Sequence, residues 1–218
     1  MTKNKYCLIF DMDGVVCDSI PFHKQAWKEF MSRHGIKYSE KFFDKHINGQ
    51  TNDEIFARLF KHNLNNAEKQ KLIEQKETIY RRLYKPHIKP LPGLIKFLKE
   101  QTKNKVKIAL ATAGPEKNVN FVLTKTKTKK YFTAIVDDKG VKKGKPDPEI
   151  FLKAAKKLKT KPTDCIVFED AITGVEAGKR AGMKVVGILT NYSKKQLCKA
   201  DAFAKDFTNI NKIINSLI

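Results

Sequence analysis

The sequence lacks any hydrophobic run long enough to cross a membrane. None of its 218 residues belongs to an uninterrupted apolar stretch of the roughly 18–20 residues that a membrane span needs. The polar start, residues 1–5, leads directly into a short apolar segment and has no longer apolar region typical of a secretory signal. We therefore expect a cytoplasmic protein with no membrane partner.

Cysteine is scarce and follows no recognisable pattern. The four cysteines form no CxxC pair and no spacing typical of metal ligands; they are Cys7, Cys17, Cys165 and Cys198. Cys7 and Cys165 lie in apolar segments, where a free thiol behaves as a small hydrophobe. In a reducing compartment we expect buried, reduced thiols rather than disulfides.

Arginine is rare, although the formal net charge is +21. Almost all basic residues are lysines spread along the chain, and arginine occurs only as Arg33, Arg58, Arg81, Arg82 and Arg180. Bidentate reading of guanine favours arginine, so we do not expect a nucleic-acid partner. The pattern is typical of a lysine-rich solvated surface, with weak affinity for polyanions or attraction of anionic substrates as the alternatives.

Short apolar runs alternate with helical patterns over most of the chain. Buried strands are predicted at residues 6–10, 106–111, 134–136, 165–168 and 185–189. Helices are predicted between the later strands, at residues 94–101, 116–124, 148–159 and 174–181. This alternation predicts an α/β fold, a Rossmann-like parallel sheet with helices on both faces.

Residues 21–87 interrupt the alternation. This stretch has no convincing strand pattern, only amphipathic helical segments at 22–34, 53–61 and 67–84, and prolines mark the return to the sheet. We expect an all-helical cap domain, residues 19–87, inserted into an α/β core domain formed by residues 1–18 and 88–218.

The first predicted strand ends in an acidic pair, Asp11 and Asp13, within the string DMDG. Ligands of open parallel sheets bind beyond the carboxyl ends of the strands, so both carboxylates lie where chemistry is expected. Two carboxylates this close raise each other's pKa unless a cation lies between them. A calcium-binding EF-hand loop is excluded, because positions that should supply its remaining ligands include Val15, Val16 and Phe22. A structural acid pair is the alternative.

A hydroxyl and two small residues follow the second predicted strand: Thr112, Ala113 and Gly114. Small residues let backbone N–H groups approach an anion, and the next predicted helix points its N-terminus to the same place. This stretch is therefore a candidate phosphate-binding loop. The alternative for Thr112 is a helix cap or a turn residue.

A lysine and a second acidic pair complete the series. Lys145 lies in a loop before a predicted helix, and Glu169 and Asp170 close the fourth strand. The two carboxylates supply oxygen ligands suited to Mg²⁺. Taken alone, the lysine is typical of the surface and the acids are typical of a helix N-terminus.

Together these elements resemble the haloacid dehalogenase superfamily, and within it the subgroup of small-molecule phosphatases and β-phosphoglucomutase-like proteins. The matching strings are DMDGVVCDS, ATAG, GKPDPEIF and FEDAITGVEAGKRAGM. The similarity covers essentially the whole chain, because the helical insertion occupies this subgroup's cap position.

The resemblance implies a role for each residue of the series. Asp11 would attack phosphorus and form an aspartyl-phosphate, and Asp13 would act as general acid and base. Thr112 and the amide of Ala113 would hold the phosphoryl oxygens, and Lys145 would orient Asp11 and the phosphoryl group.

The resemblance also implies a Mg²⁺ cofactor. Its ligands would be Asp11, the backbone carbonyl of Asp13 and Asp170, with Glu169 as a further or water-mediated ligand. The cation would screen the acidic residues from the anionic substrate and offset charge in the transition state.

Residues of the predicted cap bear on the outcome of the reaction. His23, in the string FHKQAW, resembles the hinge histidine of β-phosphoglucomutase, and a histidine merely packed under the cap is the alternative. Asn48, Gly49 and Asn52 belong to the substrate loop, and the two asparagines stand where the mutases carry a lysine and an arginine that grip a second phosphate. Lys45 is a nearby cation that would compensate if the loop is shifted.

We therefore expect a magnesium-dependent phosphatase that acts on a small phosphorylated metabolite, with a sugar phosphate favoured. The alternative is β-phosphoglucomutase, which moves a phosphoryl group between C1 and C6 of glucose phosphates. A catalytically weak polyanion-binding protein with the same fold is a third possibility. The chain is expected to be a monomer.

Overall fold

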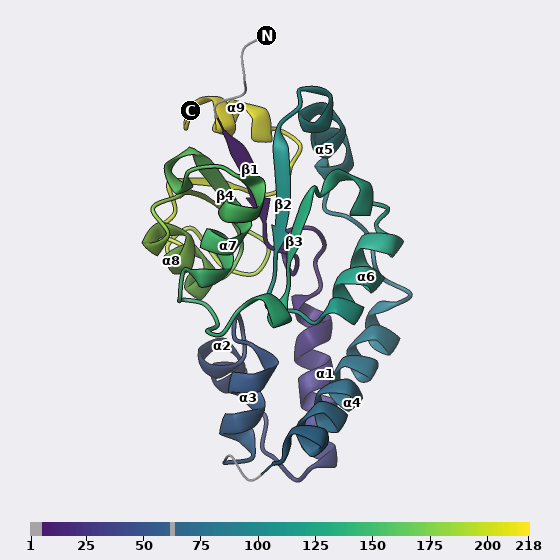
Figure 1. The fold of residues 1–218 in the computed structure, drawn as a ribbon. Coiled ribbons are helices and arrows are strands. Elements are labelled where there is room, and N and C mark those ends of the chain that lie inside the picture. The colour runs from purple at the N-terminus through teal and green to yellow at the C-terminus, as the bar shows by residue number, and fades with distance from the viewer. Residues whose placement is uncertain (1–5, 62–63) are drawn as a thin grey trace.

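The computed structural model describes residues 6–61 and 64–218 and contains a six-stranded parallel sheet (Figure 1). The strands are β1 (Cys7–Phe10), β2 (Lys107–Ala111), β3 (Ala134–Val136), β4 (Cys165–Glu169), β5 (Lys184–Ile188) and β6 (Ala202–Ala204). Their order is β3-β2-β1-β4-β5-β6, and all neighbours are parallel. The strand order reverses between β1 and β4, the point at which such sheets bind their ligands.

Helices cover both faces of the sheet. They are α5 (Leu94–Lys103), α6 (Glu116–Lys125), α7 (Glu149–Leu158), α8 (Ile172–Arg180) and α9 (Ile210–Asn215), with short 3-10 helices η1 (Lys129–Tyr131), η2 (Asp138–Gly140) and η3 (Pro162–Asp164). Leu8 and Phe10 share a core with α5, α6 and α9, whereas Cys7 and Ile9 share one with α7 and α8. Successive side chains of a strand point to opposite faces, so two covered faces require continuous apolar strands. The predicted α/β class is confirmed.

Four further helices lie at one end of the sheet, between β1 and α5 in the described chain (Figure 1). We call them the inserted helices: α1 (Ile20–Arg33), α2 (Glu40–His46), α3 (Asn52–Leu59) and α4 (Asn66–Tyr84). The chain leaves and returns at adjacent points, because the Leu91 N–H donates to the Val16 carbonyl oxygen at 3.0 Å. The domain boundaries before residue 19 and after residue 87 stay a prediction.

The inserted helices hold two charged residues in an apolar stripe. On α4, Lys76 and Glu77 are as buried as their neighbours Ile73 and Tyr80, and they lie on the side that faces α1 and α6. Across residues 6–61 and 64–218, no helix combines the length and apolar character required to cross a bilayer.

Several short elements were not predicted. Strand β6 has three residues, and helices α2 and α9 have seven and six residues. Such helices are too short for a periodic pattern to emerge, and β6 (AFA) lacks the β-branched residues that mark the equally short β3 (AIV). All four cysteines are free, and Cys7, Cys17 and Cys165 are buried as expected. Cys198 is exposed, which corrects the expectation of buried thiols; it lies in a turn-rich segment between β5 and β6.

Phe10, directly before Asp11, lies at the centre of an aromatic cluster. Its ring centroid is between 4.6 and 6.3 Å from those of Phe97, Phe132, Phe168 and Phe207. We expect Phe10→Ala to lower the free energy of unfolding by about 3–5 kcal/mol, because the fully buried ring leaves a cavity. Urea denaturation measures this. Leu152→Ala, at a side chain that is 40% exposed, should cost about 0.5 kcal/mol or less, and equal losses would contradict the prediction.

Candidate active site

The carboxyl ends of β1 and β4 bring together three carboxylates and one ammonium group. Asp11 follows β1, Glu169 ends β4 and Asp170 comes next. Lys145 Nζ lies 2.6 Å from Asp11 Oδ1 and 2.6 Å from Glu169 Oε2. All four side chains are buried. The fold alone unites them, because Lys145 lies 134 positions from Asp11 and 24 from Glu169.

This cluster is short of positive charge. Burial raises the pKa of Asp11 to about 8 although Lys145 opposes the rise, and burial together with Glu169 raises the pKa of Asp170. One oxygen of each carboxylate lies within 4.8 Å of the others. Carboxylate oxygens are the donors that Mg²⁺ prefers, and a divalent cation would balance three carboxylates beside a single ammonium. The donor set therefore fits the predicted magnesium ion.

Asp13 is held by α1 and the loop before it. Ser19 Oγ donates to Asp13 Oδ1 at 2.5 Å, and His23 Nε2 lies 3.2 Å from the same oxygen. Lys76 Nζ lies 3.1 Å from His23 Nδ1; because an ammonium group only donates, Nδ1 accepts and Nε2 carries the proton toward Asp13. Burial raises the pKa of Asp13, but His23 and Ser19 outweigh it and hold the pKa below its ordinary value. The carboxylate is therefore ionised in this conformation.

The loop after β2 and Asp11 line one cavity. Thr112 is buried, and its Oγ1 accepts a hydrogen bond from the Gly114 N–H at 3.0 Å. The hydroxyl thus closes the turn, which is the structural role considered for it, while Thr112, Ala113 and Gly114 also line the cavity. Helix α6 begins at Glu116, so its N-terminus lies next to this loop.

The loop before α3 covers the acid cluster, which consists of Asp11, Glu169 and Asp170. Its Gly49 carbonyl oxygen accepts from the Lys145 N–H at 3.2 Å, and Gln50 Nε2 donates to the Lys145 carbonyl oxygen at 2.5 Å. Glu54 Oε1 accepts from the Gly144 N–H at 3.1 Å. These hydrogen bonds fix the inserted helices on the loop that carries Lys145.

The three loop residues predicted to contact substrate have protein partners as well. Asn48 Nδ2 donates to the Tyr192 hydroxyl at 3.3 Å, and Asn52 Nδ2 donates to Glu77 Oε1 at 3.3 Å. Gly49 has a φ of 81°, and a Cβ there would collide with the first turn of α8. Only glycine allows this loop to approach the core so closely.

A single cavity gathers every residue predicted for the site. Its lining includes Asp11, Asp13, His23, Asn48, Gly49, Asn52, Thr112, Ala113, Gly114, Lys145, Glu169 and Asp170. The cavity lies between the carboxyl end of the sheet and the inserted helices. The fold thus brings these residues together, while their individual roles stay predictions.

Comparison with known proteins identifies the family. The haloacid dehalogenase-like hydrolases match residues 8–188. The chain belongs to this family of enzymes. A β-phosphoglucomutase of Bacillus subtilis is 34% identical over 189 residues, which cover 83% of this chain and 82% of that protein. A phosphorylated carbohydrates phosphatase of Thermotoga maritima is 33% identical over 204 residues, which cover 90% and 92%.

A solved structure supports the same assignment. The β-phosphoglucomutase of Clostridium difficile matches with a TM-score of 0.85 at 30% identity, over 97% of this chain and 96% of that one. The predicted superfamily and subgroup are therefore confirmed.

Sequence reasoning missed four residues of this haloacid dehalogenase-like site. Ser19 lies inside the DMDGVVCDS string but received no role, and Lys76 and Glu77 could have been noticed as charges within an apolar helical stripe. Asn191, whose Nδ2 donates to Asp170 Oδ2 at 2.9 Å, follows β5 and carries no signal in the sequence. Its contact depends on the fold alone.

Gly14 allows the backbone to lie against the acid cluster. Its φ is 77°, and a Cβ would lie 2.0 Å from Asp170 Oδ2. We expect Gly14→Ala to displace this carboxylate and weaken Mg²⁺ binding at least about tenfold, as measured by calorimetry. Gly35→Ala is the matched control, because Gly35 has a φ of 66° and open space around it. Both variants should share the backbone cost of about 1–2 kcal/mol, and equal Mg²⁺ affinities would refute the prediction.

Proposed function

We propose that this enzyme is a magnesium-dependent phosphatase that hydrolyses a small phosphorylated metabolite, with a sugar monophosphate favoured, through an aspartyl-phosphate on Asp11. The observation that carries the proposal is the buried Asp11 carboxylate, held 2.6 Å from the Lys145 ammonium in a cavity that Asp13 also lines. A fixed carboxylate nucleophile beside a second, independently held carboxylate is the arrangement that two-step phosphoryl transfer needs.

The first step forms a bond between an Asp11 oxygen and phosphorus and breaks the bond to the ester oxygen, which takes a proton from Asp13. In the second step Asp13 accepts a proton from water, the water oxygen bonds to phosphorus, and orthophosphate leaves Asp11. Asp13 is ionised where Ser19 and His23 hold it, so this conformation presents the base form. Protonation must precede its action as an acid.

The residues that would hold Mg²⁺ are Asp11, Asp170 and the backbone carbonyl of Asp13, and the bound ion would offset the charge of the phosphoryl group. Glu169 already accepts hydrogen bonds at both oxygens, from Lys145 and from the N–H groups of Asp170 and Ala171. These contacts support a water-mediated role for Glu169.

The alternative, β-phosphoglucomutase activity, has its own support. The Bacillus subtilis relative carries that name, and His23 contacts Asp13 as the resemblance implies for the hinge histidine of a mutase. Against it stand the neutral amides of Asn48 and Asn52, which give no charge-assisted grip on the second phosphate of a bisphosphate intermediate.

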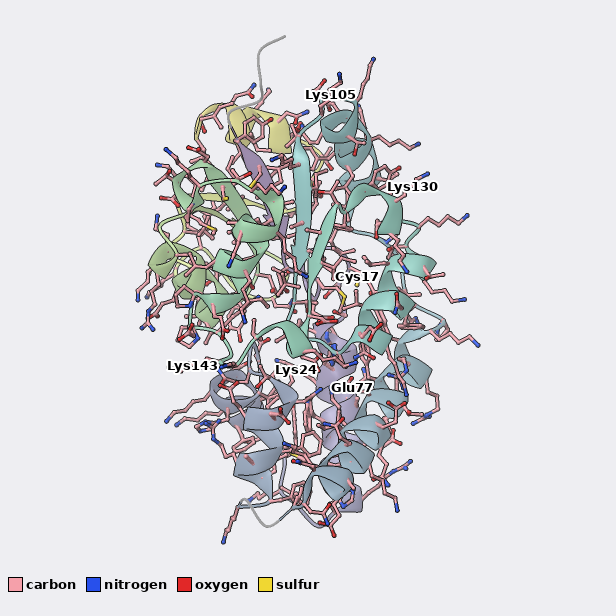
Figure 2. All side chains as sticks on the ribbon, in the orientation of Figure 1. Cys17, Lys24, Glu77, Lys105, Lys130 and Lys143 are labelled. Atoms are coloured by element: carbon pink, nitrogen blue, oxygen red, sulfur yellow. The ribbon has the colours of Figure 1, made fainter. Side chains whose placement is uncertain are left out.

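The lysine-rich surface gives no support to a nucleic-acid site. In Figure 2 the labelled Lys105, Lys130 and Lys143 lie at separate places along the molecule, and nitrogen atoms tip side chains all around its outline. Such a spread favours general solvation of the surface, and we keep the expectation of a monomer whose partner is a small phosphate ester.

Asp11→Asn should lower kcat by about 1,000-fold or more, because a neutral amide is a poor nucleophile. The assay is orthophosphate release from a panel of sugar monophosphates with Mg²⁺, and chelation of Mg²⁺ should abolish release by the wild-type enzyme. Asp18→Asn, at an exposed carboxylate, is the control and should retain activity. Full activity of Asp11→Asn would exclude an aspartyl-phosphate.

Hydrolysis and isomerisation can be separated with one substrate. We expect β-glucose 1-phosphate, supplied with a trace of glucose 1,6-bisphosphate, to yield orthophosphate faster than glucose 6-phosphate. The reason is that Asn48 and Asn52 cannot hold the bisphosphate intermediate while it reorients. Phosphorus NMR follows both products, and predominant formation of glucose 6-phosphate would instead assign the mutase activity.

A further inference from the structure

We infer that Glu77 determines the charge class of the substrate: it makes the cavity wall formed by the inserted helices accept uncharged hydroxyl groups and reject a second phosphate. This deepens the proposed function and rests on it in one respect, the placement of the reacting phosphate at Asp11. Glu77 was not among the residues predicted for the site.

Glu77 is a buried carboxylate on α4 that lines the cavity. Its Oε1 accepts from Lys76 Nζ at 3.0 Å and from Asn52 Nδ2 at 3.3 Å, and its Oε2 accepts from Asn118 Nδ2 at 2.6 Å. Burial raises the pKa of Glu77, but the ammonium group of Lys76 and the hydrogen bond from Asn118 outweigh it and hold the pKa below its ordinary value. With about four acceptor positions on a carboxylate, one remains for a substrate hydroxyl.

Glu77 also neutralises the cation nearest to this wall. Lys76 Nζ lies 3.0 Å from Glu77 Oε1 and 4.7 Å from the centroid of Trp27, so the ammonium is buried and paired. Among the described residues that line the cavity, the single lysine or arginine is Lys145, which is bound to Asp11 and Glu169. A second phosphate would therefore meet a carboxylate and no unpaired cation, and like charges in a partly buried cavity repel each other.

The amides around Glu77 are oriented by it. An ionised carboxylate only accepts hydrogen bonds, so Asn52 turns its NH₂ toward Glu77 and its Oδ1 away. Asn118, on α6, turns its NH₂ toward Glu77 in the same way, and its Oδ1 accepts from Arg81 Nη1 at 2.8 Å. The wall therefore presents acceptors, Glu77 and Asn52 Oδ1, which recognise the hydroxyl groups of a neutral polyol.

The test measures dissociation constants for matched probes that differ by one phosphate. The pairs are glucose 6-phosphate with glucose 1,6-bisphosphate and fructose 1-phosphate with fructose 1,6-bisphosphate, titrated by calorimetry with Mg²⁺ in the Asp11→Asn background to prevent turnover. With Glu77 intact, a monophosphate should bind at least about tenfold more tightly than its bisphosphate. Adding Glu77→Gln should shift this ratio toward the bisphosphate by about tenfold, because Lys76 loses its counter-charge.

Two further variants separate charge from structure. Lys76→Met should shift the ratio in the opposite direction, since it leaves the carboxylate without its cation, and general loosening of the helices cannot produce opposite shifts. Glu68→Gln is the matched control: it removes the same charge from the same helix, at an exposed side chain in the first turn that does not line this cavity. It should leave the ratio unchanged.

The inference is overturned if Glu77→Gln weakens both probes of a pair equally or leaves the ratio within about twofold, since Glu77 would then only join α4 to α6. It is also overturned if neither monophosphate binds. If Glu77→Gln fails to fold, the shift produced by Lys76→Met decides. Selective binding of a monophosphate that the wild-type enzyme does not hydrolyse would refute the proposed function alone, and equal hydrolysis of mono- and bisphosphates would refute the inference alone.

Discussion

The buried ammonium of Lys145, between Asp11 and Glu169, is the interaction on which the site depends. Removing one partner of such a buried pair leaves an uncompensated charge and costs about 3–5 kcal/mol. The backbone of Lys145 also holds the loop before α3, because its N–H and its carbonyl oxygen form hydrogen bonds with Gly49 and Gln50. One residue therefore holds Asp11, the proposed nucleophile, links the ends of β1 and β4, and anchors the loop that covers the cavity.

Charge is distributed unequally between the two walls of this cavity. At the sheet, three carboxylates surround one ammonium group, and their oxygens form a donor set suited to a divalent cation. At the inserted helices, Glu77 and Lys76 neutralise each other within hydrogen-bonding distance. Under the proposed function, the reacting phosphate would therefore bind at the sheet, beside Lys145, and the opposite wall would suit a group without charge.

The sequence predicted what depends on local chemistry at strand ends. Asp11, Thr112 and Glu169 each follow an apolar run directly, and parallel strands carry their carboxyl ends to one edge, so their meeting place followed from the fold class. Contacts between distant side chains could not be predicted in this way. Glu77 and Asn118 lie 41 positions apart on two helices whose relative position depends on the packing of α4 against α6. The three-residue β6 was missed because its sequence AFA has no β-branched residue, whereas the equally short β3, which was predicted, has the sequence AIV.

Lys76 connects Glu77 with Asp13 through His23. Its ammonium group contacts His23 Nδ1 on one side and Glu77 Oε1 on the other, and His23 in turn contacts Asp13. Because an ammonium group only donates, it fixes the tautomer of His23 and, through it, the proton that faces Asp13. A change in the charge at Glu77 alters the field on Lys76 and His23 together. Glu77, proposed to select the charge of the substrate, and Asp13, proposed as general acid and base, therefore belong to one network of polar contacts through Lys76 and His23.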